Sequence, residues 1–235
     1  VHCHTEYSDG RDTILDMARA AERRGAGYIT ITDHSISAHY AGGLTIDDLE
    51  RQWDEIARVQ QQVSVRILRG IESDILADGA LDYPDHVLER FDVIIASLHG
   101  RLRMDEAEMT RRLERTMRLP VFKIWGHALG RLLLRRPPVA CDVDRVLDAV
   151  AGSRAAIEVN GDPHRLDLPP DWIRKARQRD IRFVISTDAH STWGLDYLRY
   201  GTLMARRGGL RRAEVLNTLE AAEFSRAVRP AGAPR

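Results

Sequence analysis

The stretch Asp92-Val-Ile-Ile-Ala-Ser-Leu-His99 is an almost unbroken apolar run that ends in a histidine. Continuous apolar character is typical of strands that are buried on both faces, as in a parallel sheet. Other short runs rich in valine and isoleucine recur along the chain, separated by longer amphipathic stretches. The predicted strands are Val1–His4, Tyr28–Thr32, Arg66–Gly70, Asp92–Ala96, Val121–Trp125, Ala155–Val159 and Arg182–Ser186.

The stretches between these runs carry apolar residues every three or four positions, which is the spacing of amphipathic helices. Strands that alternate with helices predict an α/β fold, a barrel of β/α units, rather than an antiparallel fold. We expect a single domain over residues 1–228 and a flexible tail over residues 229–235, which are rich in proline, glycine and alanine. The predicted helices are Thr13–Arg24, Ile46–Gln62, Asp105–Arg118, Val143–Ala151, Pro170–Arg179, Trp193–Arg206 and Leu210–Leu219.

Composition excludes several classes of protein. With 43% apolar and 30% charged residues, the 235-residue chain can form a substantial core and is not globally disordered. Apolar runs long enough for a transmembrane helix are missing, and so is a secretory signal. The two cysteines, Cys3 and Cys141, exclude a disulfide scaffold and predict a cytoplasmic protein.

Because the sequence starts at Val1 without a methionine, we expect that residues precede it in the natural protein.

The formal net charge is zero, with 35 basic and 35 acidic residues. This balance excludes a globally basic nucleic-acid-binding protein but not a local basic cleft. All but two of the basic residues are arginine, an excess that the codon bias of a GC-rich genome explains. Individual arginines can still bind phosphate through two parallel hydrogen bonds.

Polar side chains lie at the end of every predicted strand. Six of the nine histidines fall in or just beyond such an end, which is where β/α barrels form their active sites. In chain order, the residues at these ends are His2, His4, Asp9, Asp33, His34, Glu72, His99, His127, Glu158, Asn160, Asp188 and His190.

Imidazoles and carboxylates that converge on one end of a barrel predict a site for divalent metal ions. His2 and His4 are two residues apart, so on a strand both point to the same face, and Cys3 between them is a weaker candidate ligand. A single histidine is more often a core or surface residue, but six at equivalent positions are hard to attribute to chance. The remaining histidines, His39, His86 and His164, are not expected to be ligands, although His39 lies where it could touch substrate.

The ordered motifs His-x-His, Thr-Asp-His, Gly-Ile-Glu, Ser-x-His, Gly-His and Asp-Ala-His resemble those of the polymerase and histidinol phosphatase (PHP) superfamily. The resemblance covers nearly the whole chain. Stretches almost entirely outside these motifs are similar, more narrowly, to the C-terminal PHP domain of bacterial family-X DNA polymerases. These stretches are Ser35–Gly43, Gly79–Pro84, Gly126–Arg136 and Arg165–Leu168.

The resemblance implies a distorted (β/α)7 barrel that holds three divalent ions, which could be manganese, zinc or iron. Its ligands carry over onto suitable residues at every position, with Glu72 bridging two of the ions. One ion would take His2, His4, Glu72 and Asp188, a second Glu72, His99 and His127, and the third Asp9, His34 and His190.

Such a centre would hydrolyse phosphate esters by a metal-bound hydroxide, with Glu72 and Asp188 as catalytic residues. Arg131 and Arg165 are expected to stabilise the transition state, because their segments carry the narrower resemblance. Arg101 and Arg103 are weaker candidates for that role. Asp33 is expected either to orient a ligand by accepting a hydrogen bond from it or to form a helix cap or a loop hydrogen bond.

Three functions remain open. The first is a manganese-dependent 3′–5′ exonuclease or related 3′-end-processing activity on DNA in repair, together with a polymerase domain N-terminal to Val1. The second is a small-molecule phosphomonoesterase, such as a histidinol-phosphate or nucleotide phosphatase, which the neutral net charge favours. The third is a non-catalytic module that stabilises a polymerase, and the complete set of ligands argues against it.

Overall fold

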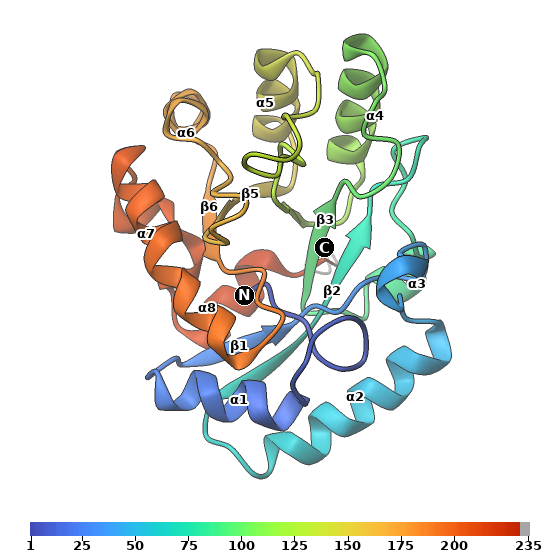
Figure 1. Cartoon of the computed structure of the whole chain (residues 1–235), viewed down its shortest axis with the longest axis vertical. Coiled ribbons are helices and arrows are strands. Elements are labelled where there is room, and N and C mark those ends of the chain that lie inside the picture. Colours follow the sequence, from blue (N-terminus) through green and yellow to red (C-terminus); the bar gives the residue numbers. More distant parts are fainter. Residues whose placement is uncertain (231–235) are drawn as a thin grey trace.

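The computed structural model describes residues 1–230 and contains a curled sheet of six parallel strands that are adjacent in chain order (Figure 1). Helices alternate with the strands and cover the outside of the curl. The predicted α/β fold, a distorted barrel in one domain, is therefore confirmed. The strands are β1 (Tyr28–Ile31), β2 (Arg66–Asp74), β3 (Val93–Ser97), β4 (Lys123–Trp125), β5 (Ala155–Asn160) and β6 (Phe183–Ser186).

Several helices begin where a side chain caps the first turn. Thr13, Thr45, Asp105 and Asp142 each accept a hydrogen bond from the backbone N–H three residues further on. Within residues 1–230, every helix is too short or too polar to span a bilayer. The helices are α1 (Ile14–Arg23), α2 (Ile46–Gln60), α3 (Asp85–Leu88), α4 (Glu106–Arg118), α5 (Val143–Ala151), α6 (Pro170–Arg177), α7 (Leu198–Arg207) and α8 (Ala221–Val228).

The predicted first strand, Val1–His4, is not a regular strand. Cys3 forms an isolated parallel bridge with Ala189, and His4 N–H donates to the Ala189 carbonyl over 2.8 Å. On the other side, Thr32 N–H donates to the Cys3 carbonyl over 2.9 Å. This short segment therefore lies between the ends of β6 and β1 and brings its histidines into the interior of the curl.

The C-terminal part differs most from the prediction. The helix expected over Leu210–Leu219 is wrong, because two short 3₁₀ turns, Arg212–Glu214 and Leu216–Thr218, occupy that segment. The amide of Asn217 bonds the backbone N–H and C=O of Ile185 over 2.9 and 2.7 Å, which holds the second turn against β6. The helix expected over Trp193–Arg206 begins instead as a 3₁₀ helix, Thr192–Tyr197, before α7.

Helix α8 was not predicted, and the chain after it was expected to be a flexible tail. The first two residues of that tail accept hydrogen bonds: the Pro230 carbonyl from Phe122 N–H and the Arg229 carbonyl from Arg154. Residues 231–235 of the predicted tail lie outside the described residues.

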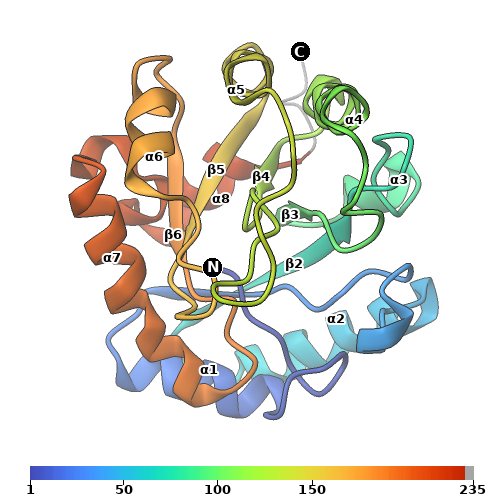
Figure 2. The ribbon, with the colours of Figure 1, turned by 45° about the horizontal axis from the view of Figure 1, so that its top comes forward.

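Hydrophobic cores lie on both faces of the sheet. The outer core packs residues such as Ile94 and Phe183 against the surrounding helices. The inner core fills the curl and includes Ile95 together with Phe224 and Val228 of α8, the helix that lies behind the sheet in Figure 2. Phe224 stacks on Tyr28, the first residue of β1, with ring centroids 4.8 Å apart. Helix α8 therefore closes the interior at the amino ends of the strands, and polar groups gather at the opposite end.

Candidate metal centre

The sheet places the polar side chains by its two-residue period. Leu68 packs in the inner core, and Glu72 lies four residues further along β2 and so faces the same interior. In β6, Val184 packs in the inner core, and Asp188 follows at the same interval just after the strand. Each strand thus contributes apolar side chains to the closed end of the interior and a ligand-type side chain to the open end.

All nine predicted ligands lie in one cluster at these carboxyl ends. Donor atoms of eight of them, all but His127, form three overlapping groups, and within each group all atoms lie within 4.8 Å of one another. These groups are His2, His4, Glu72 and Asp188; His4, Asp9, His34 and His190; and His34, Glu72 and His99.

Glu72 is the centre of the cluster. Its Oε1 lies 2.8 Å from Nε2 of His127 and 3.4 Å from Nε2 of His99, and its Oε2 lies 3.0 Å from Nδ1 of His34. The first group matches the ligand set expected for one ion. The grouping around His99 differs from the expected one, since His34 lies close to His99 while His127 joins the cluster through Glu72.

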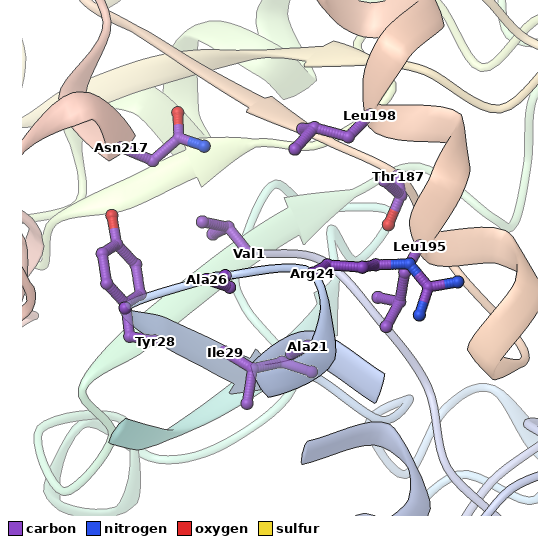
Figure 3. Close-up of a pocket in the computed structure, with 12 residues that line it drawn as sticks. Val1, Ala21, Arg24, Ala26, Tyr28, Ile29, Thr187, Leu195, Leu198 and Asn217 are labelled. Atoms are coloured by element: carbon purple, nitrogen blue, oxygen red, sulfur yellow. The ribbon is translucent and has the colours of Figure 1, made fainter. Parts of the chain in front are cut away.

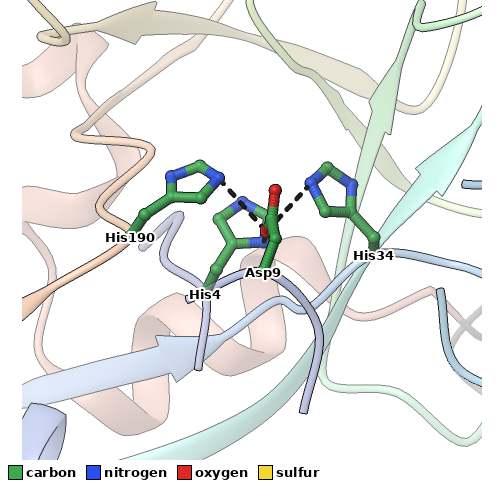
Figure 4. Close-up of side chains that lie close together, drawn as sticks. All are labelled: His4, Asp9, His34 and His190. Carbon is green, nitrogen blue, oxygen red and sulfur yellow. Dashed lines mark ion pairs between the residues drawn. The ribbon is translucent and has the colours of Figure 1, made fainter. Parts of the chain in front are cut away.

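One side of the cluster is open to solvent. Asp9 Oδ1 lies 3.3 Å from Nε2 of His190, 3.5 Å from Nε2 of His34 and 3.8 Å from Nδ1 of His4 (Figure 4). The side chains of Asp9 and His190 are 37% and 39% exposed, whereas that of Glu72 is fully buried. The cluster is therefore accessible to solvent from the side of Asp9 and His190.

The side chains present fit divalent metal ions. Buried donor atoms of the cluster, including His2 Nε2, His4 Nδ1 and Glu72 Oε2, have no hydrogen-bond partner among residues 1–230. Burying such atoms without a partner is costly, and a cation that accepts their lone pairs removes that cost. Mixed imidazole and carboxylate donors suit manganese, iron and zinc.

The electrostatics of the cluster keep its carboxylates charged. Burial alone would raise the pKa values of Glu72 and Asp188, but neighbouring imidazoles hold both well below their usual range. Burial opposes the charged form of Glu158 as well, yet attraction to His2 lowers its pKa to about 2. Glu72, Asp188 and Glu158 are therefore carboxylates at neutral pH, the form that attracts cations.

Carboxylates behind the ligands were not assigned a role from the sequence. Glu158 accepts from His2 Nδ1 over 2.7 Å and from the backbone N–H of His127 over 2.5 Å. Asp74 accepts from Nδ1 of His99 in the same way. Such contacts fix which ring nitrogen faces the metal. Asp74 could have been found from the sequence, since it lies two residues after Glu72 and shares its face of β2.

Asp33 holds the loop that carries Asp9 and does not touch a ligand side chain. Its carboxylate accepts from the backbone N–H of Thr5 over 2.7 Å and from the Ser8 hydroxyl over 2.5 Å. Gln52 of α2 donates to the same carboxylate over 2.7 Å. Of the roles expected for Asp33, these contacts correspond to a loop hydrogen bond, which here joins Asp33 to the segment that contains Thr5 and Ser8.

The two arginines expected to be catalytic have different surroundings. Arg165 lies beside the cluster, with Nε 3.0 Å from Oδ2 of Asp188, and its buried Nη1 has no hydrogen-bond partner among residues 1–230. Arg131 instead donates to the backbone carbonyls of Arg165 and Leu166. Arg131 therefore anchors the loop that presents Arg165.

The other residues considered from the sequence lie outside the cluster. Arg101 and Arg103 are exposed on the loop after β3. The Cys3 thiol points to the Thr30 carbonyl over 3.2 Å, and burial raises its pKa to about 12, which disfavours a thiolate ligand. The histidines that were not expected to be ligands, His39, His86 and His164, are exposed.

A separate cavity of about 310 Å³ lies at the amino end of β1 (Figure 3). Val1, Tyr28, Leu195 and Leu198 line it, together with the Arg24 side chain. Its lining includes no histidine or carboxylate, so it lacks the donors that define the cluster at the opposite end.

Comparisons with known proteins agree with the ordered motifs. The profile of the PHP domain family matches residues 1–161. A Bacillus subtilis (strain 168) protein named DNA polymerase/3'-5' exonuclease PolX is 38% identical over 218 residues, or 92% of this chain and 38% of that protein. The chain thus spans well under half of that relative.

Proteins named probable phosphatases also match. One from Caldanaerobacter subterraneus is 28% identical over 80% of this chain and 74% of its own length. One from Thermoanaerobacter sp. (strain X514) is 27% identical over 92% of this chain and 89% of its own length. Together with the curled parallel sheet and the cluster at its open end, these matches show that the chain belongs to the PHP domain family.

Proposed function

We propose that this chain is a metal-dependent phosphoesterase that removes nucleotides from DNA 3′ ends, as a 3′–5′ exonuclease in repair. The observation that carries the proposal is the cluster of nine imidazole and carboxylate side chains around Glu72. The family and the relatives support the coarser conclusion, a hydrolase of phosphate esters. The printed name of the Bacillus subtilis relative supports the choice of DNA and of a polymerase partner domain.

The residues of the cluster would bind the metal ions. His2, His4, Glu72 and Asp188 would hold one ion, and the remaining cluster residues would hold others, up to three in all. When bound, such ions supply Lewis acidity and an activated water molecule at neutral pH.

Arg165 would bind a non-bridging phosphate oxygen through its free Nη1. Its Nε contact with Asp188 orients the guanidinium, and Arg131 positions it through the loop backbone. The buried surroundings strengthen each of these charge interactions, because little water competes with them. The open side at Asp9 and His190 leaves room for the rest of the substrate.

A paired hydrolysis assay tests the proposal. Metal-stripped protein is reloaded with Mn²⁺ and given either a 5′-labelled single-stranded oligonucleotide or a panel of phosphomonoesters that includes histidinol phosphate. We expect shortening of the oligonucleotide from its 3′ end. An intact oligonucleotide alongside rapid phosphate release from the panel would refute the exonuclease.

That second outcome defines the other candidate, a small-molecule phosphomonoesterase. The specific observation in its favour is that relatives named probable phosphatases match 80% or more of this chain and most of their own length.

A further inference from the structure

Tyr40 is an exposed aromatic residue beside the cluster. It lies in the short 3₁₀ helix His39–Ala41 between β1 and α2, and it is 71% exposed. Its ring centroid is 6.2 Å from that of His34 and 6.3 Å from that of His99. The ring planes are inclined by 58° and 65°, so these imidazoles do not stack on its faces.

The loop that carries Tyr40 is fastened to the cluster at both ends. Ser35 N–H donates to the Glu72 carbonyl over 3.0 Å, and Leu44 N–H donates to the His34 carbonyl over 2.9 Å. Gly43 packs so tightly that a Cβ there would lie 2.0 Å from the Ser35 carbonyl oxygen. These contacts hold the loop, and with it the exposed ring of Tyr40, in a fixed position relative to the cluster.

Both anionic and cationic side chains act on the Tyr40 ring. Partial burial of its hydroxyl, with the negative charges of Asp74 and Glu72, raises the pKa of Tyr40. Arg136 is partly buried nearby, with its Nε bound to the Gly130 carbonyl over 2.7 Å, and Arg165 lies against Asp188. Tyr40 and Arg165 thus both border the cluster, Tyr40 at His34 and His99 and Arg165 at Asp188.

We propose that Tyr40 contacts the substrate by stacking its ring on the nucleobase of the nucleotide whose phosphate ester lies at the cluster. This inference rests on the proposed function and adds a base-binding subsite to it. A nucleotide carries its base one sugar away from its phosphate, which suits a ring that borders two imidazoles at the edge of the cluster. Stacking on an aromatic side chain suits any base, because every base has a π-face.

The test compares a base-bearing end with a baseless one. Wild-type protein, Tyr40→Ala and Tyr40→Phe are given the same oligonucleotide with an ordinary or an abasic 3′-terminal nucleotide. A mononucleotide and the matching sugar phosphate form a second pair, which distinguishes a free nucleotide from a strand end. Tyr200→Ala on α7, a tyrosine that is in none of the ligand groups and lies next to none of their rings, is the control.

For Tyr40→Ala we expect KM for the base-bearing member to rise roughly tenfold, with kcat and the baseless member unchanged. Tyr40→Phe keeps the ring and is expected to behave like wild type. If KM rises equally in Tyr40→Ala and Tyr40→Phe, the effect is due to the hydroxyl and not to the ring. If Tyr40→Ala raises KM equally for the base-bearing and the baseless substrates, Tyr40 does not contact the base. Either result overturns the inference.

Binding provides a readout without turnover. Fluorescence anisotropy of a labelled oligonucleotide with 3′-terminal phosphorothioate linkages should show roughly tenfold weaker binding to Tyr40→Ala than to Tyr40→Phe. Absence of hydrolysis on every substrate would reject the proposed function, whereas the binding comparison would still decide the role of Tyr40. Equal binding by the two variants would reject the base subsite.

Discussion

His2 and Glu158 form a fully buried pair in which Nδ1 of the imidazole donates to Oε1 of the carboxylate over 2.7 Å. Because the carboxylate accepts this hydrogen bond, the proton stays on Nδ1 and the lone pair of Nε2 faces the cluster. Nε2 lies 3.4 Å from Glu72 and 3.5 Å from Asp188. A residue of β5 that is not itself in any ligand group thus determines which atom of His2 can bind a metal.

Replacing Glu158 tests this arrangement. Glu158→Gln keeps the shape of the side chain but has a single oxygen for the donors of His2 and His127. We expect metal affinity to fall about 10- to 100-fold, as for other groups that orient metal-binding histidines. Titration of the stripped protein with Mn²⁺ measures the loss, and Glu223→Gln, an exposed change on α8, is the control. If the affinity for Mn²⁺ is unchanged in Glu158→Gln, Glu158 does not orient His2 for metal binding.

Asp188 and Glu72 are expected to be essential for hydrolysis and not for folding. Asp188→Ala and Glu72→Ala each remove a donor from the group around His2 and His4. Hydrolysis should be lost while the circular dichroism spectrum stays that of the wild type, because the apolar cores on both faces of the sheet are untouched. Wild-type rates in buffer replete with metal would contradict a cluster mechanism.

The two arginines should separate kinetically. Removing one preorganised donor to a transition-state oxygen typically lowers kcat about 100- to 1,000-fold, and this loss is expected for Arg165→Ala. Arg131→Ala should cause a smaller loss, because Arg131 reaches the site through the backbone of Arg165 and Leu166. Steady-state kinetics decide between them. A larger loss for Arg131→Ala would assign the phosphate contact to Arg131.

Asp167 should make stability depend on pH. Burial raises the pKa of Asp167 to about 7 from its ordinary value of 3.8, so between these values the folded chain keeps a proton that the unfolded chain releases. The free energy of unfolding of the wild type therefore falls, relative to Asp167→Asn, as pH rises from about 4 to about 7, and is level above.

Urea unfolding of both proteins across this pH range measures the difference. Asn can still accept the hydrogen bond that Leu129 N–H donates to Asp167 Oδ2 over 2.9 Å. Asp171→Asn, an exposed change on α6, is the control. If the difference in free energy of unfolding between wild type and Asp167→Asn does not change with pH, Asp167 does not have a raised pKa in the folded chain.

Most of the site could be predicted because its residues follow a simple rule. Parallel strands end at one edge, so ligand-type residues just after buried runs, such as Asp188 and His190, converge without any knowledge of the loops. The carboxylates that bind the histidine ligands were harder to distinguish from the ligands themselves. Asp74 and Glu158 have ligand-type side chains but serve as partners of His99 and His2, and only their positions on the strands separate the two roles.

The fold departed from prediction where spacing alone is ambiguous. Leu210–Leu219 has helical spacing, but the bonds of Asn217 to Ile185 favour short turns. Helix α8 buries Phe224 and Val228 over two turns, too few positions for a clear pattern. The role of Arg131 depends on the path of a loop in the folded chain, which no local motif encodes.

The most direct test of the central claim is to titrate Mn²⁺ into metal-free protein while counting bound ions by mass spectrometry and following hydrolysis of bis(p-nitrophenyl) phosphate. We predict no hydrolysis without metal and a rise that follows the binding of up to three ions per chain. The same titration of Asp188→Ala should bind fewer ions and stay inactive. Hydrolysis that survives complete removal of metal, or full occupancy with no hydrolysis, would contradict the account.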